Sequence, residues 1–178
     1  MTNEAGEAVA RRVLEVLAVR GETLATAESL TGGMLASRLT DVPGASRSFV
    51  GGVVSYATRV KESLLGVPPE VVAQHGVVSG QCAEAMARGV RDRLDATWGV
   101  ATTGVAGPDS QEGKPVGTVW VAVAGPSRVE ALRLALDGDR SAIREDTWRE
   151  ALSLLERLLG ESASGDRGIP AREEPDLG

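Results

Sequence analysis

The sequence predicts a single α/β domain, a layered α/β/α sandwich with a mixed sheet and helices on both faces. Three observations favour this fold class. The length of 178 residues lies within the roughly 100–200 residues of one domain. Hydrophobic residues make up 42% and charged residues 25% of the chain, which is typical of a globular protein. Segments with helical spacing alternate with short apolar runs, and such alternation places helices on both faces of a sheet.

The first half of the chain is predicted to alternate helices with strands. Gly21 ends a first run of apolar residues at helical spacing, and Gly66 ends a later one. Pro68 and Pro69 suit the first turn of a short helix that ends near His75, because proline lacks an amide that this turn leaves unpaired. The other elements expected here are a helix over 4–20, a strand over 23–28, a helix from Met34 to about 43, a strand over 51–56 and a helix over 58–65.

The second half of the chain carries two capping signals. Ser79 is placed to cap a helix over 80–95, and Asp139 to cap a final helix over 140–159. Two apolar runs joined at Gly125-Pro126 are expected to pair as antiparallel strands, which makes the sheet mixed. The expected strands are 98–104, 116–124 and 129–136, with a polar loop over 106–115.

The composition changes after Gly160. The segment ESASGDRGIPAREEPDLG is rich in Gly, Pro, Ser and charge, and it offers almost no apolar side chains to bury. We therefore expect a folded domain over 1–160 and a disordered tail over 161–178.

Net acidic charge limits the classes of partner. The 25 acidic and 19 basic residues give a net charge of -6, which argues against sequence-independent binding of nucleic acid, because that affinity comes mainly from neutralising phosphates. No run approaches the roughly 18 apolar residues of a membrane span, and residues 1–7 lack the features of a signal peptide. We expect a cytoplasmic protein that binds neither nucleic acid nor membrane, and the sequence leaves a homo-oligomer open.

Histidine and cysteine are almost absent, which narrows the chemistry. The single Cys82 cannot form an internal disulfide, and together with the single His75 it makes no zinc-binding cluster. Cys82 lies among small residues of a predicted helix, so we expect a buried thiol. His75 is expected to interact with the carbonyls at a helix end. The sequence predicts no metal and no cofactor, and a catalytic base other than these two residues.

The segment TAESLTGG contains the first candidate for catalysis. It places Ser29 on a strand-to-helix turn, where the hydroxyl would lie exposed at the edge of the sheet. The amides of Leu30, Thr31, Gly32 and Gly33 would then point out of a helix N-terminus, where partial positive charge suits an oxyanion or a phosphate. The alternative is that Ser29 only caps the helix.

Lys61 is the second candidate. It follows the predicted strand over 51–56 by one helical turn, in a chain with only two lysines, Lys61 and Lys114. Burial or a neighbouring cation would lower the pKa of Lys61 and allow it to act as a base toward a serine. The alternative is a solvated lysine on a helix surface.

Two further segments suggest a ligand. Arg140 and Arg144 share one face at the start of a helix, where the helix dipole disfavours cations. They predict either an anionic ligand or ion pairs with the acidic residues nearby. Thr102, Thr103 and Gly104 end a strand and would present hydroxyls and amides to a ligand.

The chain resembles the C-terminal domain of the competence/damage-inducible protein CinA over about residues 5–160. The resemblance rests on ordered motifs with family-like spacing, which are TAESLTGG, PGASRSFVGGVVSYATRVKESLLGV, GVVSGQCAEAMARGV, TTGVAGPDS, GKPVGTVWVAV and GDRSAIR. Stand-alone members of this family are nicotinamide-nucleotide amidases. The resemblance implies a small-molecule nucleotide substrate, namely nicotinamide mononucleotide, hydrolysed to nicotinate mononucleotide and ammonia in pyridine-nucleotide salvage. It also implies that the amino-terminal domain of longer CinA proteins is missing from these residues.

The resemblance implies a role for each matched residue. Ser29 matches the family nucleophile, Lys61 its general base, and Tyr56 the residue that orients Lys61 or the substrate. Many relatives have Cys at the position of Leu30, so no thiol is needed beside Ser29. The expected substrate-binding residues are Leu30, Thr31, Gly32, Gly33, Ser46, Thr103, Gly104, Arg140 and Arg144, and the sequence does not separate the two arginines as phosphate ligands.

Two other functions stay open at this point. One is a Ser-Lys amidase or esterase that acts on another phosphorylated small molecule. The other is a non-catalytic nucleotide-binding or regulatory module, which the presence of both Ser29 and Lys61 argues against.

Overall fold

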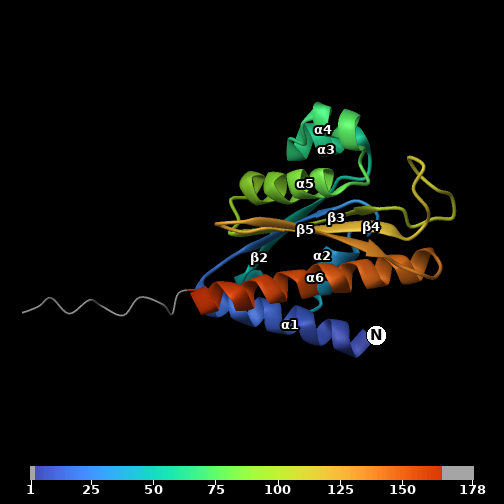
Figure 1. The fold of residues 1–178 in the computed structure, drawn as a ribbon. Coiled ribbons are helices and arrows are strands. Elements are labelled where there is room, and N and C mark those ends of the chain that lie inside the picture. The colour runs from blue at the N-terminus through green and yellow to red at the C-terminus, as the bar shows by residue number, and fades with distance from the viewer. Residues whose placement is uncertain (1–2, 166–178) are drawn as a thin grey trace, which may run out of the picture.

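One sheet of five strands forms the centre of the fold (Figure 1). The computed structural model describes residues 3–165, whose strands are β1 (Leu24–Glu28), β2 (Phe49–Val54), β3 (Trp98–Gly104), β4 (Thr118–Ala124) and β5 (Val129–Ala135). They lie in the order β2-β1-β3-β4-β5. β1 is parallel to both β2 and β3, whereas β4 is antiparallel to both β3 and β5. The sheet is therefore mixed, as predicted.

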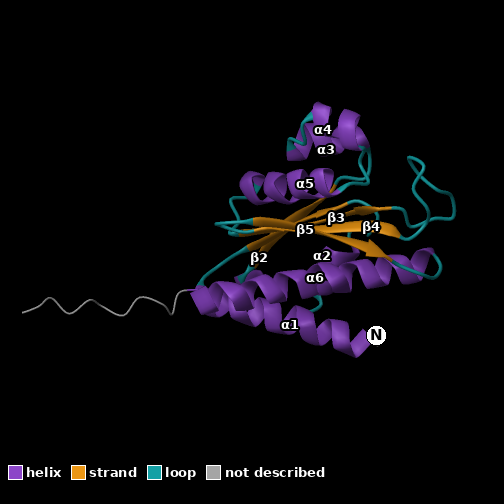
Figure 2. Cartoon of the chain, in the orientation of Figure 1, coloured by secondary structure: helices purple, strands orange, loops and turns teal. Residues whose placement is uncertain are grey.

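Helices cover both faces of this sheet (Figure 2). Within the same residues they are α1 (Asn3–Arg20), α2 (Met34–Thr40), α3 (Thr58–Leu65), α4 (Pro69–His75), α5 (Gly80–Arg93), α6 (Arg140–Gly165) and the short 3-10 helix η1 (Ala45–Arg47). α1, α2 and α6 share a core with one face, and α5 covers the other face with α3 and α4 packed on it. The predicted α/β/α sandwich is confirmed.

The alternation of side chains along each strand divides the core in two. In β4, Val119, Val121 and Val123 pack toward α1 and α6, whereas Ala122 and Ala124 face α5. Successive strand residues point to opposite faces, so Trp120 also faces α5, where it packs beside Gly80. α5 lies close to the sheet where small residues face it, since a side chain at Gly99 would meet the Ala87 carbonyl of α5. The core under α5 contains Cys82, whose side chain is buried as expected.

The predicted elements and caps agree closely with the structure. The Ser79 hydroxyl accepts a hydrogen bond from the Cys82 amide (3.1 Å), and the Asp139 carboxylate accepts one from the Ala142 amide (2.8 Å). The strand expected over 51–56 lies instead at Phe49–Val54.

The last helix is longer than predicted. α6 continues to Gly165 rather than ending at 159. Its final turns are held by Arg157, which donates to Glu161 at 3.0 Å, and by Ser162, whose hydroxyl donates to the Leu158 carbonyl at 2.9 Å. These polar side chains support the helix without apolar burial, which is why composition alone did not show it. The rest of the expected tail, residues 166–178, lies outside the described residues.

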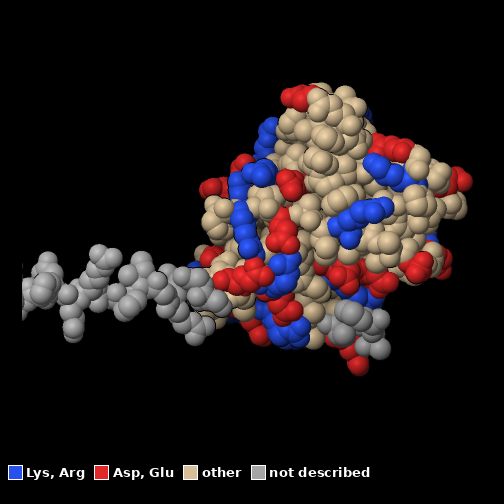
Figure 3. Space-filling model, viewed as in Figure 1, with Lys and Arg blue, Asp and Glu red and all other residues tan. Residues whose placement is uncertain are grey.

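Charged side chains of both signs are intermixed over the face shown in Figure 3. Among the described helices, none is long and apolar enough to cross a membrane.

Candidate active site

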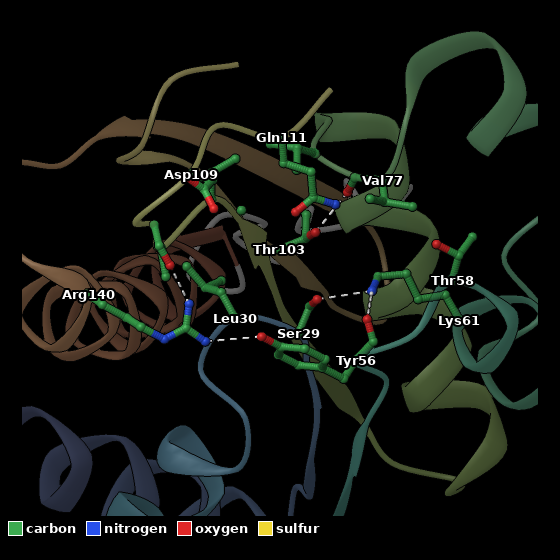
Figure 4. A pocket seen from close by; sticks show the side chains of 15 residues that line it. Ser29, Leu30, Tyr56, Thr58, Lys61, Val77, Thr103, Asp109, Gln111 and Arg140 are labelled. Carbon is green, nitrogen blue, oxygen red and sulfur yellow. Dashed lines mark hydrogen bonds between the residues drawn. The ribbon is translucent and has the colours of Figure 1, made fainter. Parts of the chain in front are cut away.

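A cavity of about 180 Å³ opens where β1 and β3 end (Figure 4). Ser29 comes from the end of β1, Thr103 from the end of β3, Lys61 from α3 and Arg140 from the start of α6. β1 and β3 are parallel neighbours in the sheet. After β1 the chain continues to β2, on one side of this pair of strands, and after β3 it continues to β4, on the other side. Ligand sites in α/β sheets form at such a point, because the diverging loops leave a crevice between them.

Ser29 and Lys61 are in direct contact in this cavity. The ammonium nitrogen Nζ of Lys61 lies 3.0 Å from Ser29 Oγ, 2.7 Å from the Ser55 carbonyl oxygen and 3.3 Å from the Tyr56 carbonyl oxygen. The Lys61 side chain is only 1% exposed. Lys61 is therefore a buried residue of the site and not a solvated lysine on a helix surface.

Burial lowers the pKa of Lys61, and the more distant charge of Glu112 opposes this shift only in part. The neighbouring Cys82 thiol remains protonated near neutral pH, because burial raises its pKa to about 11. No carboxylate lies within 4.0 Å of Lys61 Nζ in the described part of the chain. Three oxygens surround Nζ, and in the deprotonated amine the two N–H groups serve the two carbonyls while the lone pair faces Ser29 Oγ. This is the arrangement of a base that can accept the serine proton.

The turn after Ser29 differs from the expected helix start. α2 begins only at Met34, after Gly33 in the left-handed conformation (φ 99), and Ser29 does not cap it. The helix amides are bound instead by the carboxylate of Glu28, which is 1% exposed. Oε2 accepts from the amides of Gly33 and Leu35 at 3.0 Å each, and Oε1 accepts from Ala36 at 2.8 Å. The expectation that the Gly33 amide is free for a ligand is therefore wrong.

Glu28 is a site residue that the sequence analysis missed. An acidic residue at the end of an otherwise uncharged strand, just before a helix start, was the available signal, because helix N-termini favour negative charge.

Arg144 also binds the turn after Ser29. Its Nε donates to the Leu30 carbonyl at 3.0 Å and its Nη2 to the Thr31 carbonyl at 2.9 Å. The Gly32 amide donates to the Ser29 carbonyl at 3.1 Å, so it too is occupied. Arg144 lies outside the lining of the cavity, as do Thr31 and Gly32, whereas Leu30 lines it.

Arg140 is the arginine that lines the cavity. Its Nη1 donates to the Gly107 carbonyl at 2.7 Å, and its Nη2 donates to the Tyr56 hydroxyl at 3.0 Å. Tyr56 thus contacts Lys61 through its carbonyl and Arg140 through its side chain. Among residues 3–165, neither Arg140 nor Arg144 has a carboxylate within 4.0 Å, and the nearby acids of α6 pair with Arg38 and Arg149 instead. The alternative of ion pairs for these two arginines is therefore not observed.

The loop between β3 and β4 forms the wall opposite Ser29. The Glu112 carboxylate accepts from the amides of Val77 (2.9 Å) and Val78 (3.1 Å), and Lys114 donates to the Val78 carbonyl. Hydrogen bonds to these amides and the charge of Lys114 lower the pKa of Glu112, although its burial alone would raise it. Asp109 and Gln111 of this loop line the cavity together with Thr58 of α3, and the sequence analysis identified none of the three.

The hydroxyls expected at the end of β3 are used within the protein. Thr102 Oγ1 lies 2.8 Å from Thr31 Oγ1, and Thr103 Oγ1 donates to the Val77 carbonyl at 2.8 Å. Thr103 and Gly104 line the cavity, whereas Thr102 does not.

Ser46 lies away from this cavity. It is exposed in η1, just before the first residue of β2, and lines a separate hollow with Pro43 and Phe49. β1 and β2 are parallel, so the start of β2 lies at the opposite edge of the sheet from Ser29. The structure therefore does not bring Ser46 together with the other expected site residues. No group of three or more metal-ligating side chains occurs among the described residues.

Fold and site together define an α/β protein in which a buried lysine contacts a half-buried serine at the carboxyl ends of the parallel strands. The model of the CinA C-terminal domain matches residues 6–159, and the chain belongs to this family. It is 56% identical over 147 residues to a CinA-like protein of Frankia casuarinae, covering 83% of this chain and 34% of that protein. It is 48% identical over 164 residues to a CinA-like protein of Gemmatimonas aurantiaca, covering 92% of this chain and 38% of that protein. The chain thus spans little more than a third of these relatives.

Solved structures of the family have the same fold. A CinA superfamily protein from Klebsiella pneumoniae superposes with a TM-score of 0.85 at 34% identity, covering 88% of this chain and 98% of that one. The competence/damage-inducible protein CihA from Agrobacterium tumefaciens superposes with a TM-score of 0.83 at 38% identity, covering 86% of this chain and 95% of that one. These proteins match the present chain over nearly their whole length.

Proposed function

We propose that this chain is a nicotinamide-nucleotide amidase, which hydrolyses the carboxamide of nicotinamide mononucleotide to nicotinate mononucleotide and ammonia. The observation that carries the proposal is the 3.0 Å contact between Lys61 Nζ and Ser29 Oγ, with the lysine buried and free of any carboxylate contact among the described residues. A serine in contact with a buried lysine whose pKa is lowered by burial is a nucleophile paired with a base that acts once it is deprotonated. The resemblance to stand-alone family members supplies the substrate.

In the first half of the reaction, Ser29 Oγ attacks the carboxamide carbon while Lys61 Nζ accepts the hydroxyl proton. The carbonyl oxygen becomes an oxyanion, and amide donors beside Ser29 stabilise it. The C–N bond then breaks, and Lys61 delivers the proton to the leaving nitrogen, which departs as ammonia. An acyl-enzyme ester at Ser29 remains.

In the second half, a water molecule attacks the ester carbon and Lys61 accepts its proton. The C–O bond to Ser29 breaks, nicotinate mononucleotide leaves, and Lys61 returns the proton to Ser29 Oγ. One water is consumed and one ammonia is formed. Every proton transfer involves Lys61 Nζ, which the carbonyls of Ser55 and Tyr56 hold in place.

The position of Arg140 favours a phosphorylated substrate. It lines the cavity and has no carboxylate within 4.0 Å among the described residues, so its charge is available to an anion. Its planar fork suits a phosphate, to which it can donate two parallel hydrogen bonds. We assign it to the 5′-phosphate of the mononucleotide.

Release of ammonia from nicotinamide mononucleotide by the purified protein tests the proposal. The Ser29→Ala protein should release ammonia at less than about a hundredth of the wild-type rate while it still binds the mononucleotide. Ser63→Ala is the matched control, because Ser63 is an exposed serine of α3 outside the cavity, and this variant should keep the wild-type rate. Turnover of other phosphorylated carboxamides but not of the mononucleotide would reassign the substrate. Binding of the mononucleotide without any turnover would favour the non-catalytic module.

A further inference from the structure

Arg144 contacts the backbone of the site and not its cavity. It lies on α6 one helical turn after Arg140, and its guanidinium donates to two successive carbonyls, those of Leu30 at 3.0 Å and Thr31 at 2.9 Å. These carbonyls belong to the turn that directly follows Ser29. A planar fork on two neighbouring carbonyls fixes the orientation of both peptide groups.

The Arg144 contact fixes the Thr31 and Gly32 amides directly, and the Gly32 amide in turn fixes the peptide between Ser29 and Leu30. In a trans peptide the C=O and N–H bonds are antiparallel, and Gly107-Pro108 is the one cis peptide among the described residues. The bond from Arg144 to the Leu30 carbonyl therefore turns the Thr31 N–H away from Arg144. In the same way, the bond from the Gly32 amide to the Ser29 carbonyl turns the Leu30 N–H away from Gly32.

The amides of Leu30 and Thr31 are not used within the described fold. Neither donates a hydrogen bond to an acceptor within residues 3–165. Leu30 directly follows Ser29 and lines the cavity, whereas Thr31 is the next residue and is buried behind it. Backbone amides that directly follow a nucleophile are placed to receive the oxyanion that its attack creates.

The turn is fixed at both ends. Arg144 holds its carbonyls, and the buried Glu28 carboxylate holds the amides of Gly33, Leu35 and Ala36. Arg144 also keeps its positive charge behind the turn, because no carboxylate within 4.0 Å of it is found in the described part of the chain. That charge adds to the attraction for an oxyanion on the other side of the peptide groups.

We propose that Arg144 is a positioning residue for acyl transfer: it holds the Thr31 amide directly, and the Leu30 amide through the Gly32 peptide, toward the oxyanion of the tetrahedral intermediate. The proposal rests on the proposed function in one respect, that Ser29 is the nucleophile. It separates the two arginines, since Arg140 binds the phosphate and Arg144 acts through the backbone.

Acylation of Ser29 by p-nitrophenyl acetate tests this role without the nucleotide. The reagent has neither phosphate nor pyridine ring, so its reaction depends on Ser29, Lys61 and the oxyanion donors. Arg144→Ala should lower the acylation rate constant about 100-fold, the typical loss of one oxyanion donor. It should lower kcat for nicotinamide mononucleotide by a similar factor and change KM less than about threefold. Arg144→Lys should restore part of the rate, because a lysine supplies charge without the planar fork.

The ratio of kcat/KM for the mononucleotide to kcat/KM for its riboside measures the preference for the phosphorylated substrate. This ratio should stay at the wild-type value in both Arg144 variants. Arg157→Ala is the control for the loss of a cation from α6, because Arg157 is exposed and pairs with Glu130 and Glu161 outside the site. It should leave acylation unchanged. A purely structural Arg144 would lower the melting temperature but leave the acylation rate of the folded protein within about threefold of wild type, and that result would overturn the proposal.

Two other results also decide against Arg144 as a positioning residue. The first is loss of the preference for the mononucleotide at a wild-type acylation rate, which would make Arg144 a phosphate ligand. The second result applies if the Arg144→Ala protein does not fold. In that case, a wild-type acylation rate in the Arg144→Lys protein would decide against the proposal. A wild-type protein that acylates Ser29 but releases no ammonia from the mononucleotide would refute the amidase function alone, and the acylation rates would still decide the role of Arg144.

Discussion

Replacement of Glu28 by Gln should destabilise the protein, because this carboxylate holds the start of α2 from a buried position. Oε2 accepts two amide hydrogen bonds and Oε1 accepts a third. A glutamine can place its oxygen at the Oε2 position and keep two bonds, but its NH2 group then faces the Ala36 amide. Two donors cannot bond to each other, and at 1% exposure no bulk solvent replaces the lost acceptor.

The expected loss can be calculated from these contacts. A hydrogen bond to a charged group contributes about 1.5–3 kcal/mol, and a negative charge at a helix N-terminus about 0.3–1 kcal/mol. Loss of one bond and of the charge therefore costs about 3 kcal/mol. In a chain of 178 residues this corresponds to a fall in Tm of about 6–12 °C.

Urea denaturation of the two proteins, followed by circular dichroism, measures this loss directly. Glu15→Gln provides the matched control, since Glu15 is exposed on α1, and its unfolding free energy should change by less than about 0.5 kcal/mol. A loss below about 1 kcal/mol in Glu28→Gln would refute the reasoning, because it would mean that the three amides do not depend on the carboxylate. Ammonia release measured on the same samples should fall as well, since the turn that carries Ser29 begins at Glu28.

Two further predictions concern Lys61 and Arg140. Burial lowers the pKa of Lys61 below 10.5. Its amine should therefore lose its proton below that pH, and kcat/KM should rise with pH as it does so. A kcat/KM that does not change between pH 6 and about 10 would contradict Lys61 as the base. The unfolded chain holds this proton more tightly, so the unfolding free energy should also rise with pH between the lowered pKa and 10.5. Lys61→Met should abolish both trends in urea titrations and ammonia assays, and it should be more stable than wild type at pH 7. Arg140→Ala should lower kcat/KM for the mononucleotide about 100-fold and leave the riboside nearly unchanged; an equal loss on both substrates would place the phosphate elsewhere.

The sequence was sufficient to predict the elements of the fold, whereas the pairing of Ser29 with Lys61 also needed the resemblance to the CinA C-terminal domain. Spacing of apolar residues and the caps at Ser79 and Asp139 are local signals, and the structure reproduces them. The structure agrees with that pairing, because Ser29 and Lys61 follow parallel neighbouring strands, which end at the same edge of the sheet.

The contacts made by backbone groups could not be anticipated in the same way. Whether an amide or carbonyl of the turn after Ser29 is free depends on side chains distant in sequence. Arg144 binds Leu30 and Thr31 across more than a hundred residues, as their sequence separations of 114 and 113 show. Spacing along the chain carries no information about such a pairing. Ser46 is the opposite case. The resemblance in sequence predicted that it binds the substrate, but it lines a separate hollow away from the cavity.

The anchoring of the loop between β3 and β4 has a consequence for how this site can change. The loop is attached through Glu112 and Lys114 to the segment before α5, and through the Gly107 carbonyl to Arg140. None of these attachments involves Ser29 or Lys61, which the sheet and α3 hold. The side chains of Asp109 and Gln111 can therefore be exchanged without disturbing the reacting atoms. In this architecture the lining contributed by Asp109 and Gln111 is attached independently of the Ser29–Lys61 contact, so that part of the cavity can be varied while the contact is kept.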